Sequence, residues 1–200
     1  MKKQNLLFLT CGIILFLCVG LWAMSGASAG FDTSVYMFLQ SFPKTYVQPF
    51  FMFITRFGDP LFCVILLLCI TILFYKRIGM YAIGIGLFDV LLNQILKYIF
   101  CRPRPSVEHL VHASGYSFPS GHTMIAMMLY GFLLYVVYTK MKHPLKNVLY
   151  MVLLFLIVCI PISRIYLGVH YATDIVGGLI VGFSFLCAYI SIVKEKLKNM

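Results

Sequence analysis

Charged residues are scarce in this chain of 200 residues, and acidic residues are the scarcest of them. Only 6 residues are Asp or Glu, against 16 Lys or Arg, and charged residues make up 11% of the total. Hydrophobic residues account for 62%, and the mean hydropathy is +0.95. Because soluble domains carry about 25% charged residues, this composition excludes a soluble protein and indicates an integral membrane protein.

The chain also lacks the patterns of several other protein classes. Its 7 cysteines form no Cys-x-x-Cys pair and no ligand cluster with histidine, which leaves most of them as small apolar side chains. The net charge of +10 comes without the basic, aromatic-interleaved stripe of a single-strand binder. The cations stand in short clusters beside apolar runs, where they orient the chain and meet anionic head groups. We therefore expect membrane lipids as partners, no nucleic acid, and no obligate protein partner.

Six apolar runs approach the length of about 20 residues that a membrane-spanning helix needs. We predict an all-α fold, an integral membrane bundle of six transmembrane helices that forms one domain over residues 1–200. Residues 29–57 contain two prolines and many aromatics, and they predict a short helix lying at the membrane interface after the first span. The predicted spans are residues 6–24, 59–75, 78–96, 123–139, 148–163 and 173–193.

Basic residues divide unevenly between the two ends of these spans. Cytoplasmic loops carry an excess of Lys and Arg, so we expect both termini in the cytoplasm and a multi-pass protein of the cytoplasmic membrane. The first 29 residues also resemble a signal peptide, but their apolar run is longer than a usual signal core and favours a retained anchor. Four clusters fall on the cytoplasmic side: Lys2/Lys3, Lys76/Arg77, Lys140/Lys142/Lys146 and Lys194/Lys196/Lys198.

Three short polar stretches interrupt the apolar pattern, and the predicted topology places all three on the outer side. In the first, Lys97 ends a span, and prolines 103 and 105 around Arg104 prevent a helix. The planar fork of arginine and the compact charge of lysine both suit phosphate oxygens. An interfacial anchor explains Lys97 alone, but not an Arg-Pro-Arg-Pro run on the outer face.

The second stretch, Pro-Ser-Gly-His at residues 119–122, stands directly before an apolar run. Ser120 is a typical N-cap, and Gly121 lets backbone N–H groups approach a ligand closely. A helix N-terminus favours anions, and His122 in the first turn is placed to donate a proton. A capped helix with a histidine at the interface is an equal alternative for this motif alone.

The third stretch contains Ser163, Arg164, His170 and Asp174. His170 and Asp174 are four residues apart at the start of a predicted span, so both belong on one helix face. A carboxylate on one ring nitrogen fixes the tautomer and leaves the other nitrogen free to attack, while Arg164 can reach the same phosphate. A structural His–Asp pair is the alternative, but ionisable residues in membrane segments usually mark function.

A polar stripe in span 78–96 leads up to the first stretch. Asp89, Asn93 and Lys97 follow at steps of four residues and must face the bundle interior. Asp89 and Asn93 either support Lys97 and wall a wet cavity or join two helices.

Histidine and carboxylate groups also allow a metal site as a weaker alternative. The cations at 97, 104 and 164 would surround the same position and repel a divalent ion, so we expect no metal and no cofactor. The candidate ligands would be His122, His170 and Asp174, with His109 and His112 in addition.

In order and spacing, the three stretches resemble the type 2 phosphatidic acid phosphatase family. The pattern K-x6-R-P, P-S-G-H and S-R-x5-H-x3-D is occupied at every position. The resemblance implies a helical core shared with vanadate-dependent haloperoxidases. It also implies metal-independent hydrolysis of a lipid phosphate monoester or pyrophosphate at the outer membrane face, through a phosphohistidine. Its implied substrates are phosphatidylglycerophosphate, phosphatidic acid or undecaprenyl pyrophosphate.

The resemblance also implies residue roles. His170 attacks phosphorus, Asp174 orients it, and His122 protonates the leaving oxygen and then activates water. The phosphoryl oxygens are held by Lys97, Arg104, Ser120, Gly121 and Arg164. The alternative function is a non-catalytic lipid-phosphate binding or transport protein, which would not need the two histidines and Asp174 together. A haloperoxidase is a remote alternative, because the known ones resemble soluble proteins.

Overall fold

The computed structural model describes residues 3–74 and 76–198, and these residues form helices and connecting loops without a strand. Lys2, and Tyr75 at the end of the second predicted span, lie outside the described residues. The α-helices are α1 (Lys3–Met24), α2 (Ala29–Gln40), α3 (Lys44–Thr55), α4 (Pro60–Cys69), α5 (Lys76–Phe100), α6 (Gly121–Ile125), α7 (Gly131–Lys140), α8 (Lys146–Tyr166) and α9 (Ala172–Lys198). A 3-10 turn, η1 (Arg56–Gly58), follows α3, and two π-helical segments, η2 (Ile70–Phe74) and η3 (Ala126–Tyr130), extend α4 and join α6 to α7.

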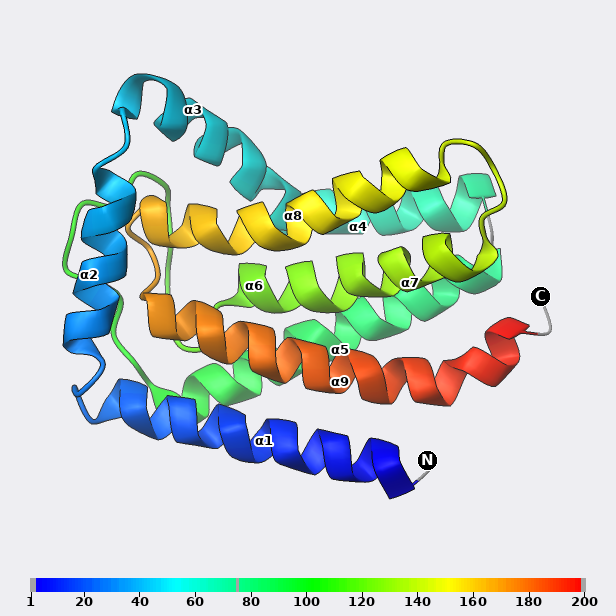
Figure 1. Cartoon of the computed structure of the whole chain (residues 1–200), viewed down its shortest axis with the longest axis horizontal. Helices are drawn as coiled ribbons and strands as arrows, with labels where there is room; N and C mark the ends of the chain where they lie inside the picture. The colour runs from blue at the N-terminus through cyan, green and yellow to red at the C-terminus, as the bar shows by residue number, and fades with distance from the viewer. Residues whose placement is uncertain (1–2, 75, 199–200) are drawn as a thin grey trace.

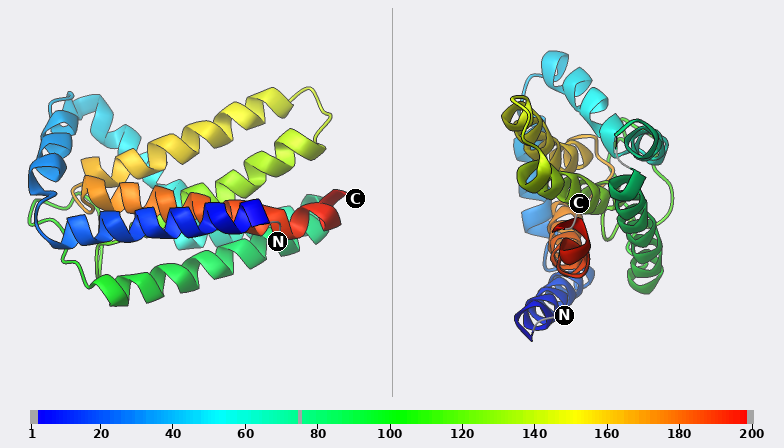
Figure 2. Two further views of the ribbon diagram at one scale, coloured as in Figure 1. Left: turned by 60° about the horizontal axis from the view of Figure 1, so that its bottom comes forward. Right: turned by 90° about the vertical axis from the view of Figure 1, so that its right-hand side faces the viewer.

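Most of the helices run roughly along one axis, and α2 crosses their ends (Figure 1). Together, α6, η3 and α7 form one continuous helix that contacts α5, α8 and α9. Its residues Met124, Leu129 and Phe132 are fully buried, so this helix forms the centre of the core. At the periphery, α1 packs along α9, as the end-on view shows (Figure 2). Outward-facing side chains such as Leu21 and Leu91 are apolar, which suits helices that satisfy their own backbone groups in lipid.

Five of the six predicted spans correspond to helices long and apolar enough to cross a membrane. The second predicted span, residues 59–75, is different. There α4 is short, and it meets α3 at a bend of 57°, so a sixth crossing exists only if this bent pair is one broken span. The bend follows from Pro60, which cannot continue the preceding helix and forces Asp59 into an extended conformation (ψ 140°).

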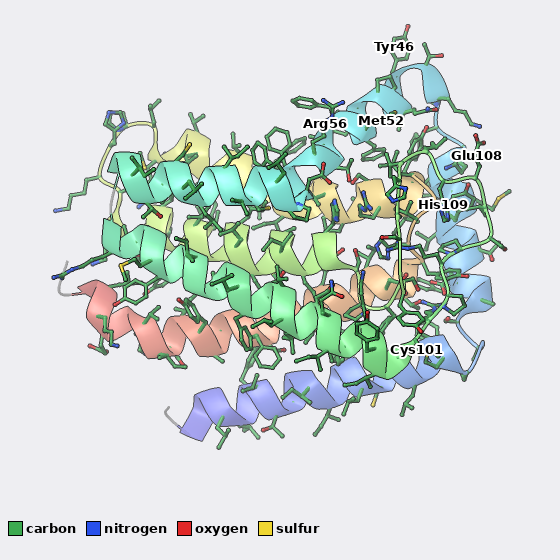
Figure 3. The ribbon with its side chains drawn as sticks, turned by 180° about the vertical axis from the view of Figure 1, so that it is seen from behind. Tyr46, Met52, Arg56, Cys101, Glu108 and His109 are labelled. Carbon is green, nitrogen blue, oxygen red and sulfur yellow. The ribbon has the colours of Figure 1, made fainter. Side chains whose placement is uncertain are left out.

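The prediction of one interfacial helix over residues 29–57 is wrong in number. Two helices, α2 and α3, occupy this segment, and Pro43 separates them as the N-cap of α3. A proline in this position lacks the N–H that a continuous helix would need. Tyr46 on α3 points away from the bundle, with 79% of its surface exposed (Figure 3).

Residues 101–120 form a helix-free loop at the end of the bundle that α2 crosses, where Glu108 and His109 lie (Figures 1 and 3). Helix α5 ends because Cys101 takes a left-handed conformation (φ 48°), and the following prolines prevent a restart, as predicted. The start of α5, the α7–α8 connection, the start of α1 and the end of α9 lie at the opposite end (Figures 1 and 2). The bundle therefore has one polar-loop end and one opposite end, to which the basic clusters at the start of α5, between α7 and α8 and at the end of α9 belong.

Candidate active site

The three polar stretches meet at the polar-loop end of the bundle. The first comes from the end of α5 and the following loop, the second from the start of α6, and the third from the α8–α9 connection. The backbone N–H of Ser120 in the second stretch donates to the carbonyl of Asp174 in the third (3.2 Å). Arg104 of the first stretch lies beside His170 of the third, with 3.3 Å between Nη1 and Nε2.

His170 and Asp174 form a buried pair. The Nδ1 atom of His170 lies 3.2 Å from Oδ2 of Asp174, and both side chains are almost inaccessible. His170 stands two residues before α9 begins, so the predicted shared helix face is wrong in detail. Contact is made because Asp174, in the first turn of α9, reaches back and also accepts the N–H of Tyr171 (2.9 Å). The carboxylate at Nδ1 leaves Nε2 as the ring nitrogen available for reaction.

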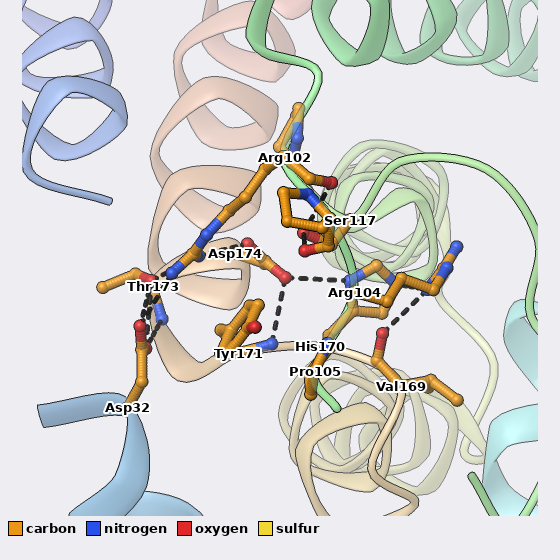
Figure 4. Close-up of polar contacts among 12 residues, drawn as sticks. Asp32, Arg102, Arg104, Pro105, Ser117, Val169, His170, Tyr171, Thr173 and Asp174 are labelled. Carbon is orange, nitrogen blue, oxygen red and sulfur yellow. Dashed lines mark hydrogen bonds and ion pairs between the residues drawn. The ribbon is translucent and has the colours of Figure 1, made fainter. Parts of the chain in front are cut away.

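Arg104 borders that free nitrogen. Its Nη1 atom lies 3.3 Å from Nε2 of His170 and donates to the carbonyl of Val169 at 2.7 Å (Figure 4). Its Nε and Nη2 atoms donate to the carbonyls of Gly115 and Ser114 (3.1 and 2.8 Å). These carbonyls fix the guanidinium beside Nε2 of His170.

Two further predicted phosphate ligands hold buried polar atoms without a partner among the described residues. Arg164 is 5% exposed, and its Nη1 donates to Thr55 at 2.6 Å while its Nε is unpaired. Ser120 is the N-cap residue of α6, but its side chain makes no cap hydrogen bond and its Oγ is unpaired. An unpaired buried polar group is costly, and both atoms are available to a ligand.

Lys97 and Gly121 line a cavity of about 450 Å³ between α4, α5 and α6. Asn93 supports this region, because its Nδ2 donates to the carbonyl of Pro119 at 3.1 Å. A Cβ on Gly121 would come within 2.9 Å of Asn93 Oδ1, so only glycine permits this approach. Asp89 is buried along the same cavity, and its Oδ1 has no partner among the described residues. The cavity is also lined by five apolar side chains from α4 and α5: Val64, Leu67, Leu68, Ile83 and Leu87.

His122 also lines this cavity, and it has a partner that the sequence did not reveal. Its Nε2 atom lies 3.0 Å from Oδ1 of Asp59, the residue at the bend between α3 and α4. Asp59 directly precedes Pro60 and therefore looks like an ordinary helix cap in the sequence. The two predicted catalytic histidines are thus each held by one carboxylate.

A second network of carboxylates, which was not predicted from the sequence, contacts Asp174. Arg102 is 7% exposed, and its Nη1 donates to Oδ1 of Asp174 (2.6 Å) while its Nη2 donates to Oδ2 of Asp32 (2.9 Å; Figure 4). Thr173 links Arg102 to Asp32, because its hydroxyl accepts from Arg102 and donates to Asp32. Tyr171 stacks on the guanidinium at 4.0 Å. The sequence offered one signal for this network, because an acidic residue such as Asp32 is costly in so apolar a chain unless it has a partner.

The pKa of His170 lies well below its usual 6.5. Burial is the main cause, and the positive charges of Arg164, Arg104 and Lys97 add to it. His170 is therefore a neutral imidazole at pH 7, as a nucleophile requires.

This shift predicts how stability depends on pH. The unfolded chain binds a proton at His170 near pH 6.5 while the folded protein does not, so acidification below 6.5 favours unfolding. Between about pH 7.5 and about pH 5.5, the free energy of unfolding should fall by about 1 kcal/mol more in the unchanged protein than in His170→Gln, because glutamine does not titrate. Denaturant titrations in detergent at both pH values measure this difference. Parallel losses in the two proteins would contradict it.

No group of three His, Cys, Asp or Glu side chains within residues 3–74 and 76–198 is arranged to hold a metal ion. Of the ligands of the alternative metal site, His170 contacts Asp174, whereas His122 pairs with Asp59. His109 is exposed, and its Nε2 lies within hydrogen-bond distance of the Pro105 carbonyl.

Known proteins are similar to this chain in sequence and in fold. The sequence profile of the PAP2 superfamily, the type 2 phosphatidic acid phosphatases, matches residues 78–198, which include all three stretches. The chain belongs to the PAP2 superfamily. The crystal structure of a transmembrane PAP2-type phosphatidylglycerolphosphate phosphatase from Bacillus subtilis superimposes with a TM-score of 0.81. That match has 28% identity and covers 94% of this chain and 96% of the other. As a PAP2 protein with this bundle, the chain is a multi-pass membrane protein.

Two curated relatives come from the same bacterium. Phosphatidylglycerophosphatase B of Bacillus subtilis is 42% identical over 98 residues, which is 47% of each protein. Undecaprenyl-diphosphatase BcrC of Bacillus subtilis is 30% identical over 115 residues, covering 53% of this chain and 55% of that protein. The aligned part of this PAP2 chain thus spans about half the length of these relatives.

Proposed function

We propose that this PAP2 protein is an enzyme that hydrolyses a lipid phosphate monoester or pyrophosphate without a metal, through a phosphohistidine. The observation that carries the proposal is the setting of His170. Its Nδ1 is held by Asp174, its Nε2 faces Arg104, and the positive charges of Lys97 and Arg164 act on the same ring. This arrangement combines a neutral nucleophile with cations that bind a phosphate.

The proposed reaction has two displacements. In the first, Nε2 of His170 forms a bond to phosphorus, the bond from phosphorus to the lipid oxygen breaks, and His122 gives its proton to that oxygen. Asp174 stabilises the positive charge that develops on the His170 ring. In the second, His122 takes a proton from water, the water oxygen bonds to phosphorus, and the phosphorus–nitrogen bond breaks. Inorganic phosphate leaves and His170 is free again.

The remaining site residues stabilise the charge of the phosphoryl group during both steps. Fixed donors act strongly in a dry site because they need no reorganisation when charge develops. Arg104 is fixed by backbone carbonyls and Arg164 by Thr55, and the Ser120 hydroxyl is buried without a partner among the described residues. The proposed phosphate ligands are Lys97, Arg104, Ser120, the N–H of Gly121, and Arg164.

A lipid substrate fits the cavity that leads away from the site. Its polar end carries Lys97 and His122, and its apolar walls come from α4 and α5. A phosphate at the polar end would place the attached hydrocarbon between these helices. The relatives' names support phosphatidylglycerophosphate or undecaprenyl pyrophosphate, and the family resemblance adds phosphatidic acid.

We also propose that the site faces the outside of the cytoplasmic membrane and that both termini face the cytoplasm. The basic clusters at the start of α5, between α7 and α8 and at the end of α9 belong to segments at the end of the bundle opposite the site (Figure 1). Cytoplasmic segments carry such clusters.

Purified protein in a chelator should release inorganic phosphate from at least one of the three lipids, and vanadate should inhibit it, because vanadate mimics the pentacoordinate phosphoryl group. A panel of the three lipids in mixed micelles, read by free phosphate, measures this. Lipid binding without phosphate release from any of them would favour the non-catalytic binding or transport alternative.

A further inference from the structure

The bend between α3 and α4 touches the proposed general acid directly. Oδ1 of Asp59 lies 3.0 Å from Nε2 of His122. Arg56 marks the same bend in Figure 3. The neighbouring Thr55 accepts the hydrogen bond from Arg164 (2.6 Å), so this short segment holds two residues of the site.

The carboxylate of Asp59 does not cap α4, although Asp59 stands at the N-cap position of that helix. Asp59 is the N-cap residue of α4, and an N-cap aspartate normally accepts a backbone N–H of the first turn. Here its side chain makes no cap hydrogen bond. The carboxylate is turned to His122 instead, and half of its surface (47%) remains exposed.

The backbone beside Asp59 is shaped to the His122 ring. A Cβ on Gly58 would lie 2.7 Å from Cδ2 of His122, so a larger residue would displace the ring. The carbonyl of Phe57 accepts the hydroxyl of Tyr130, which ties the bend to the central helix. The contact between Asp59 and His122 is therefore set by three adjacent backbone positions.

We propose that Asp59 is a positioning residue that holds His122 by Nε2 and directs Nδ1 to the leaving oxygen of the substrate. This inference rests on the proposed function and adds to it. The pair mirrors His170, whose Nδ1 is held and whose Nε2 is free. A carboxylate at Nε2 stabilises the doubly protonated ring that a general acid must carry. The proton on Nδ1 moves to the lipid oxygen as the phosphorus–oxygen bond breaks, and the proton on Nε2 stays between His122 and Asp59.

The test compares substrates whose leaving groups need the proton to different degrees. An alkyl phosphate lipid needs protonation of its oxygen, whereas p-nitrophenyl phosphate does not. Asp59→Ala should lower kcat/KM for the lipid by about 10- to 100-fold and for p-nitrophenyl phosphate by no more than about 3-fold. Asp59→Asn, which keeps an acceptor without the charge, should fall between Asp59→Ala and the unchanged protein. Because kcat/KM covers steps up to the first displacement, slow release of phosphate does not mask the effect.

Glu108→Gln is the matched control, because it removes an exposed carboxylate on the same end of the molecule. It should leave both substrates unchanged. Asp59→Ala combined with His122→Ala should be no slower on the lipid than His122→Ala alone, because the two residues act as one unit.

An equal loss on both substrates, or an additive loss in the double variant, would overturn the role of Asp59. Failure of the unchanged protein to hydrolyse either substrate would instead overturn the proposed function. The two failures are therefore distinguishable.

Discussion

Replacing His170 by glutamine should lower kcat/KM on a lipid phosphate on the order of 10⁴-fold or more. Glutamine fills a similar volume but cannot form the bond to phosphorus that the proposed reaction requires. The cations and Asp174 would still be present, so substrate binding should survive while turnover is lost. Phosphate release and lipid binding, measured on the same preparation, separate these two effects.

His109→Gln is the matched control, because His109 lies exposed on the loop, with its Nε2 within hydrogen-bond distance of the Pro105 carbonyl. It should retain full activity. A His170→Gln protein that is folded and keeps more than about a tenth of the activity would remove His170 as the nucleophile.

Replacing Arg102 by methionine should lower the unfolding free energy by about 3–5 kcal/mol. Methionine has a similar length but leaves the buried carboxylates of Asp32 and Asp174 without their shared cation. Removing one partner of a buried ion pair costs more than the pair contributes, because the remaining charge stays buried. Denaturant titration in detergent measures the loss. Adding Asp32→Asn to this variant should recover part of it, because one stranded charge is then removed.

Arg56→Met provides the comparison, since Arg56 is exposed at the α3–α4 bend. It should change stability by less than about 0.5 kcal/mol. If Arg102→Met lowers the free energy of unfolding as little as Arg56→Met does, the network of Arg102, Asp32 and Asp174 does not stabilise the fold.

The apolar runs were sufficient to predict the long helices. In a membrane a helix must satisfy its own backbone groups, so hydropathy and length nearly determine where it lies. The prediction of one helix was wrong at residues 29–57, where Pro43 separates two helices. From Pro60 on, a short helix meets the preceding one at a bend of 57°. There the hydropathy is still high, but it carries no information on the angle between two short helices.

The motif residues were also predictable, since spacing within each stretch is local. Their supporting contacts were not. Asp59 meets His122 across 63 residues, and Asp32 meets Arg102 across 70. Such pairs depend on how the helices pack, which no local pattern encodes. Arg102 was moreover one of two arginines in an Arg-Pro-Arg-Pro run, and only packing shows that it faces Asp174 while Arg104 faces His170.

The small number of acidic residues offered an indirect signal. Of the 6 in the chain, Asp32, Asp59 and Asp174 each contact a cation or histidine of this end of the bundle. An acid in so apolar a chain is costly unless it has a partner. A search for that partner would have pointed to the end of the bundle, although not to a particular contact.

The most direct measurement is rapid quenching of a single turnover with a radiolabelled phosphate substrate. The account predicts a protein-bound label that is stable in base and labile in acid, located on the peptide that contains His170. In His122→Ala with p-nitrophenyl phosphate the label should accumulate, because formation needs no general acid while release needs a base. Full release of phosphate in a single turnover without any labelled protein, or a label on another residue, would contradict the phosphohistidine mechanism.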